Sequence, residues 1–120
     1  MGVVAWIVGL LLAAGFAMAG VAKIAGVAMM NETRDRLGLS DTLWRTIGGL
    51  EILGAIGVFI GLVDDGDVEL LGTAAAIGLI LTMIGALVYH VRTGDSIQDM
   101  MPAAVLLVLA VIYIIALAAR

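Results

Sequence analysis

The fold class of this chain is decided by residues 46–63, which read TIGGLEILGAIGVFIGLV. A helix of this length, at 1.5 Å per residue, covers about 27 Å and nearly crosses the hydrocarbon core of a membrane. The stretch carries a single ionisable residue, Glu51. Apolar and polar residues do not alternate in it, so the pattern excludes a strand of a membrane barrel. Residues 46–63 therefore predict a membrane-spanning helix.

Three further stretches have the same character and are found at residues 2–22, 70–91 and 100–119. The whole chain of 120 residues is 63% hydrophobic and 13% charged, whereas soluble domains average about 45–50% and about 25%. Its mean hydropathy is +1.21. We therefore expect an all-α polytopic membrane protein, a bundle of four transmembrane helices forming one domain over residues 1–120. We interpret residues 2–22 as a retained helix rather than a signal peptide.

Composition also excludes several function classes. The chain has no cysteine, so disulfides and thiolate metal sites are excluded, and we expect no metal site. Its net charge is -4, which makes nucleic acid an unsuitable partner. No nucleophile and base form a recognisable set, so we expect no catalytic residues and no enzymatic activity of the chain on its own.

Basic residues are distributed unequally over the predicted connections. Five lie after the first or the third helix (Lys23, Arg34, Arg36, Arg45 and Arg92), and only Arg120 lies on the opposite side. Basic residues near helix ends favour the cytoplasm. We therefore expect a multi-pass protein of the cell membrane with both termini outside the cytoplasm. Trp44 and Tyr89 are expected near the cytoplasmic boundary, where aromatic side chains are common.

The longest predicted connection runs from Gly26 to Leu43. Its apolar and charged residues are spaced as on a short interfacial helix, for which Gly38 is a suitable end, and Ser40 is a suitable N-cap for the next helix. A solvated linker with one helical turn is the alternative. The acidic run at residues 64–69 predicts a tight turn with Asp65 and Gly66 at the bend.

Small residues repeat every three or four positions along three of the helices. Lipid provides no hydrophobic force between helices, so close packing depends on such residues. We expect these positions to form helix contacts: Gly15, Ala19, Gly54, Gly57, Gly61, Gly78 and Gly85. A row left unused by the bundle would support a homo-oligomer, and we expect that row to be Gly57 and Gly61.

Glu51 is the residue that most needs an explanation, because an acidic side chain in a spanning helix costs about 2.5–3.5 kcal/mol on insertion scales. Counted from Thr46 it lies about 7–8 Å along the helix, within reach of Lys23 at the end of the first helix. His90, Tyr89 and Arg92 end the third helix on the same side of the membrane. These five residues predict one polar layer, which either binds a ligand or only fixes the helices through a Glu51–Lys23 or Glu51–His90 bridge.

Three segments carry a resemblance to a known family. They read AGVAKIAG at residues 19–26, GGLEILG at residues 48–54 and IGALVYHVRTGD at residues 84–95. In this order and spacing the chain resembles the DoxX-like family of small four-helix membrane proteins. The resemblance implies a link to membrane redox assemblies that use quinones.

Two functions stay open at this point. The first is a non-catalytic accessory or scaffold subunit of a quinone-linked membrane redox assembly, with membrane lipid and other redox subunits as partners. The second is a binder or carrier of a quinone, a lipid or another small amphipathic molecule, whose polar head would contact Glu51, Lys23 and His90. No tightly bound cofactor is expected in either case.

Overall fold

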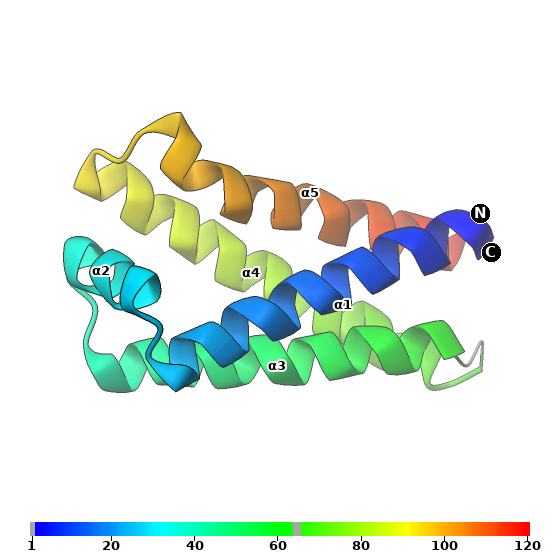
Figure 1. The fold of residues 1–120 in the computed structure, drawn as a ribbon. Coiled ribbons are helices and arrows are strands. Elements are labelled where there is room, and N and C mark those ends of the chain that lie inside the picture. Colours follow the sequence, from blue (N-terminus) through cyan, green and yellow to red (C-terminus); the bar gives the residue numbers. More distant parts are fainter. Residues whose placement is uncertain (1, 64–65) are drawn as a thin grey trace.

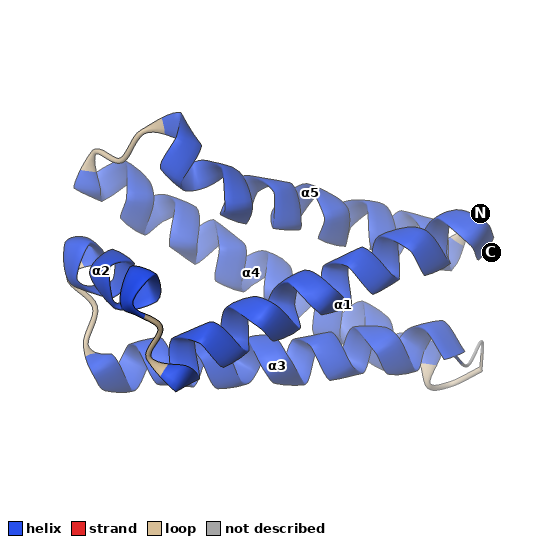
Figure 2. Cartoon of the chain, viewed as in Figure 1, coloured by secondary structure: helices blue, strands red, loops and turns tan. Residues whose placement is uncertain are grey.

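The computed structural model describes residues 2–63 and 66–120, and within these ranges every regular element is an α-helix (Figure 2). The helices are α1 (Gly2–Ala25), α2 (Ala28–Leu37), α3 (Asp41–Val63), α4 (Glu69–Thr93) and α5 (Ile97–Ala118). All but α2 are long and apolar enough to span a membrane. The predicted all-α fold with four spans and a short helix between the first two is therefore confirmed.

The four long helices form an elongated bundle of about 42 × 25 × 18 Å (Figure 1). Helix α1 packs against α3 and α5, and α4 packs against the same two helices. Both termini lie at one end of the bundle, together with the α3–α4 connection (Figure 1). Helix α2 and the α4–α5 connection lie at the other end, which we call the α2 end.

Capping residues extend two helices beyond the apolar stretches. Ser40 accepts a hydrogen bond from the backbone N–H of Leu43 at 3.1 Å, so α3 begins at Asp41 and not at residue 46. Glu51 consequently lies about 15 Å along α3 from its first residue, Asp41, and not about 7–8 Å. At α5, Ser96 and Asp99 form a reciprocal capping box.

The core of the bundle lies between all four long helices. Its largest fully buried apolar side chains are Phe16, Leu12, Leu117 and Val58, together with the Tyr113 ring. The hydroxyl of Tyr113 donates a hydrogen bond to the Val58 carbonyl at 2.8 Å. This bond joins α5 to α3 and satisfies a polar group that would otherwise be buried without a partner.

The predicted small-residue positions divide into two groups. A Cβ atom on Gly15 would approach Leu106 to 2.9 Å, and one on Gly54 would approach Leu79 to 2.6 Å. At Gly61 it would meet Gly72 Cα at 2.6 Å, so α3 and α4 are close there. Ala19 is half-buried on α1, and Gly57 faces Ala75 of α4. These five positions lie within the bundle, so the expectation that Gly57 and Gly61 form an unused row was wrong.

The other group lies on α4. A Cβ atom added at Gly78 or Gly85 would meet nothing within 4 Å, and both glycines are exposed. Their expected role in packing the bundle was wrong, because α4 turns this side outward. Of the predicted acidic turn, Asp64 and Asp65 lie outside the described residues, and residues 66–68 form a bend and turn before α4.

Candidate functional site

Two glycines bring α1 and α3 together near the α2 end. A Cβ atom on Gly20 would lie 2.5 Å from the Gly48 carbonyl oxygen, and one on Gly48 would lie 2.8 Å from that of Gly20. Such distances leave no room for a side chain at either position. The two backbones are therefore close enough for side chains one turn further along each helix to meet.

The side chains that meet there are Lys23 and Glu51. Lys23 Nζ lies 2.7 Å from Glu51 Oε1, with 11% of the lysine side chain and 1% of the glutamate side chain exposed. Within the described residues no other polar group contacts Oε1, so the Lys23 ammonium group alone compensates this oxygen. A buried charge needs such a partner, because leaving one charge of a pair unpaired is costly in an apolar interior. We call this contact the Lys23–Glu51 pair.

Trp44 completes this part of the site. Lys23 Nζ lies 4.9 Å from the centroid of the Trp44 ring, within the range of a cation–π interaction. Trp44 is 5% exposed, so its ring faces the interior of the bundle. Its Nε1 is buried and has no hydrogen-bond partner among the described residues. Trp44 therefore places an N–H donor without an acceptor beside the Lys23–Glu51 pair.

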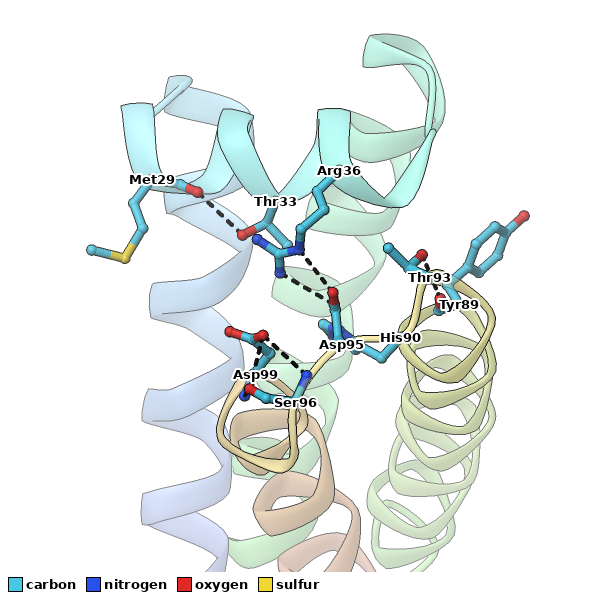
Figure 3. A network of polar contacts seen from close by, with 9 residues as sticks. All are labelled: Met29, Thr33, Arg36, Tyr89, His90, Thr93, Asp95, Ser96 and Asp99. Atoms are coloured by element: carbon cyan, nitrogen blue, oxygen red, sulfur yellow. Dashed lines mark hydrogen bonds and ion pairs between the residues drawn. The ribbon is translucent and has the colours of Figure 1, made fainter.

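His90 belongs to a second cluster and not to the Lys23–Glu51 pair (Figure 3). Its Nδ1 lies 2.6 Å from Asp95 Oδ2. Arg36 of α2 donates to both oxygens of the same carboxylate, from Nε to Oδ1 at 2.9 Å and from Nη2 to Oδ2 at 3.2 Å. We call Arg36, His90 and Asp95 the polar clasp. Of the two alternative bridges for Glu51, the one to Lys23 is present, whereas His90 contacts Asp95 in the connection that follows α4.

The polar clasp changes the ionisation of Asp95. The Asp95 side chain is only 4% exposed. Hydrogen bonds from Arg36 and then from His90 lower the pKa of this carboxyl below its ordinary value, although partial desolvation opposes them. Asp95 is therefore a carboxylate at neutral pH, and it holds the positive guanidinium of Arg36 at the end of the bundle.

Tyr89 and Arg92 lie outside both clusters. Both residues are exposed, and among the described residues neither side chain forms a hydrogen bond or an ion pair. The bond drawn at Tyr89 in Figure 3 goes from the Thr93 hydroxyl to the Tyr89 carbonyl. The five residues of the predicted polar layer are therefore divided between the Lys23–Glu51 pair, the polar clasp and the outer surface.

Arg36, Trp44 and Asp95 are the site residues that sequence reasoning did not assign. Arg36 and Asp95 are 59 positions apart, and no periodic pattern links them. Gly94, which ends α4 in a left-handed conformation, was the nearest available indication, because it turns the chain directly before Asp95. No group of three or more His, Cys, Asp or Glu side chains suited to a metal ion occurs within the described ranges.

The fold and these clusters define a class: a small multi-pass membrane protein with four spanning helices and charged groups that pair inside the apolar bundle. The profile of the DoxX-like family matches residues 7–113, and the chain belongs to this family. Comparison with curated proteins and with solved structures gave no match.

Proposed function

We propose that this DoxX-like protein is a non-catalytic accessory or scaffold subunit of a quinone-linked membrane redox assembly. The observation that supports this proposal is the closed Lys23–Glu51 pair, in which a charge inside a spanning helix is neutralised by the protein itself. A pair of this kind fixes the register of α1 against α3 without a ligand. The outer faces of the bundle then stay available for neighbouring subunits and lipid.

A second function, the binding of a quinone or another small amphipathic molecule, is favoured by one observation. Trp44 Nε1 is a buried donor without an acceptor, close to the ammonium group of Lys23. A buried donor that stays unpaired costs about 1–3 kcal/mol. A carbonyl oxygen of a ligand head group would satisfy this donor and would lie beside a positive charge.

We also propose that the α2 end faces the cytoplasm and that both termini lie outside it. Five of the six Lys and Arg residues belong to the α2 end, and Arg120 belongs to the other end. The translocation of basic residues near helix ends is unfavourable, which supports this orientation.

Native mass spectrometry of gently extracted protein separates the two functions, because it detects partner subunits and retained small molecules together. Trp44→Phe removes the N–H donor and keeps an aromatic ring, and Trp6→Phe is the matched control at the exposed end of α1. A scaffold retains its partner subunits in both variants. A ligand binder loses a small-molecule mass in Trp44→Phe alone. Extraction of a wild-type chain with neither partner nor ligand would contradict both proposals.

A further inference from the structure

Helix α2 lies between two glycines with left-handed backbones. Gly26 has a φ of 75° and Gly38 a φ of 74°, a region that other residues rarely adopt. A Cβ atom at Gly38 would meet nothing within 4 Å, so the conformation of the chain rather than close packing favours glycine there. Both ends of a ten-residue helix are therefore bends that can absorb a change in backbone angles.

Little apolar surface fastens α2 to the bundle. Leu37 is the single buried residue of this helix, and Met29 is 75% exposed. Since burial of apolar surface provides most of the stability of a helix as short as this one, α2 is held weakly. Segments with few buried contacts open locally at a lower free energy than the core.

The polar clasp attaches α2 to a part of the chain that is distant in the sequence, the connection between α4 and α5. Asn31 bonds to Gly26, and Arg34 bonds to Asp41, so both of these contacts stay close to the ends of α2 in the sequence. Within residues 2–63 and 66–120, the Arg36–Asp95 contact is the only side-chain hydrogen bond or ion pair between α2 and the α4–α5 part of the bundle. The Arg36 side chain is 40% exposed, so water can compete for it.

We propose that α2 is a hinged strap, which the Arg36–Asp95 contact closes over the α2 end of the bundle and which opens at Gly26 and Gly38. The four spanning helices stay folded when the strap opens, because their core does not include α2. Opening uncovers Leu37 and the His90–Asp95 contact to the water phase. This inference does not depend on the proposed function.

His90 has a separate role in this arrangement. It contacts Asp95 Oδ2, whereas Oδ1 is bonded to Arg36 Nε alone. The His90 contact does not involve Arg36, so it holds the carboxylate in place when Arg36 leaves. The Asp95 carboxylate therefore stays in position while the strap is open, and the strap closes when Arg36 bonds to this carboxylate again.

The strap is tested with single cysteines, since the natural chain has none. Leu37→Cys reports opening through its reaction with a water-soluble maleimide in nanodiscs, and Met29→Cys reports the reaction of an exposed site on the same helix. Each is combined with Arg36→Gln. Arg92→Gln is the matched control, because the exposed Arg92 side chain forms no hydrogen bond or ion pair among the described residues. Hydrogen exchange on the cysteine-free Arg36→Gln chain gives a second measurement for α2 and α3.

We expect Arg36→Gln to increase the labelling rate at position 37 and the exchange rate of α2 amides about tenfold, the loss expected for a charged hydrogen bond. Labelling at position 29 and exchange in α3 should not change, and Arg92→Gln should behave as the parent. Unchanged rates at both position 37 and the α2 amides would overturn the proposal. Equal loss of protection in α2 and α3 would also overturn it, because the whole bundle would then open.

Discussion

Lys23 Nζ on α1 lies 2.7 Å from Glu51 Oε1 on α3, so an ion pair joins the two helices within the apolar bundle. The contact is possible because Gly20 and Gly48 let the two backbones approach one turn away. The close approach of α1 and α3 therefore brings the Lys23 ammonium group to the Glu51 carboxylate, a charge that is costly to insert into the membrane by itself.

The first prediction concerns this pair. Glu51→Gln and Lys23→Met should each lower the free energy of unfolding, by up to about 3–5 kcal/mol, because each leaves one buried charge unpaired. The double variant should recover part of the loss, since both charges are removed together. Thermal unfolding in detergent measures all three variants. Strictly additive losses would show that the two residues are not coupled.

The second prediction concerns the glycines beside the pair. Gly20→Ala should destabilise the bundle by about 1–3 kcal/mol, because the new methyl group would overlap the Gly48 carbonyl at 2.5 Å. Gly78→Ala is the control, since its methyl group would meet nothing within 4 Å. It should leave stability unchanged or raise it by up to about 1 kcal/mol, because alanine is the better helix former. Equal losses in the two variants would mean that close packing at Gly20 is unimportant.

The third prediction is a pH dependence of the strap. The pKa of Asp95 is lowered in the folded chain, so its contribution is complete above its ordinary pKa of about 3.9 and is lost as the pH falls further. Arg36 and His90 face this carboxylate, and Asp99 and Glu32 act on Arg36 from nearby. Exchange of α2 amides should therefore be slower in the wild type than in Asp95→Asn at about pH 6, and this difference should shrink as the pH falls below about 3.9.

The ratio of the two exchange rates is the appropriate measure, because the intrinsic pH dependence of amide exchange cancels in it. A ratio that does not change with pH would show that Asp95 does not hold α2 through its charge. Arg92→Gln, compared with the wild type in the same way, should give a ratio near one throughout.

The fourth prediction concerns orientation. Cysteines at Asp35 and Asp67, both exposed, should react from opposite sides of sealed membranes, with position 35 reacting from the cytoplasm. A membrane-impermeant maleimide, applied before and after the membrane is made permeable, distinguishes the two sides. Labelling of position 35 from outside would reverse the proposed topology.

The fifth prediction concerns self-association, which we propose to involve the outward side of α4. Gly78→Leu with Gly85→Leu should weaken an oligomer and leave the monomer folded, because both positions are open in the monomer. Gly57→Leu with Gly61→Leu should unfold the monomer, since these glycines contact α4 inside the bundle. Crosslinking in bilayers together with thermal unfolding separates the two effects. An oligomer that persists in the Gly78 and Gly85 variant does not use this side of α4.

The sequence by itself determined the number of spanning helices, the all-α class and the family. Hydropathy along the chain is a local property, and about 20 apolar residues must form a helix in a membrane because their backbone groups can bond only to one another. Local patterns also determined the end of α2 at Gly38 and the cap at Ser40. Glu51 was identifiable as a site residue for a similar reason, since one charge among apolar residues requires a partner.

Only the tertiary structure decided which partners the polar residues take. Both Lys23 and His90 were open as partners of Glu51, because all three lie on the same side of the membrane. Asp95 and Arg36 lie at the ends of segments whose turns the sequence did not define. His90 contacts Asp95 because Gly94 turns the chain back over the end of α4. The polar clasp therefore depends on the path of the chain between α1 and α3 and on its path between α4 and α5.

The tertiary structure also decided which small residues are in contact. Gly61 lies against Gly72, whereas Gly78 faces outward, although their surroundings in the sequence are equally apolar. In a soluble protein the buried face of a helix is marked by hydrophobic residues. Lipid is as apolar as the interior of the bundle, so a small residue permits close approach on any face, and only the packing of the whole bundle determines which face meets another helix.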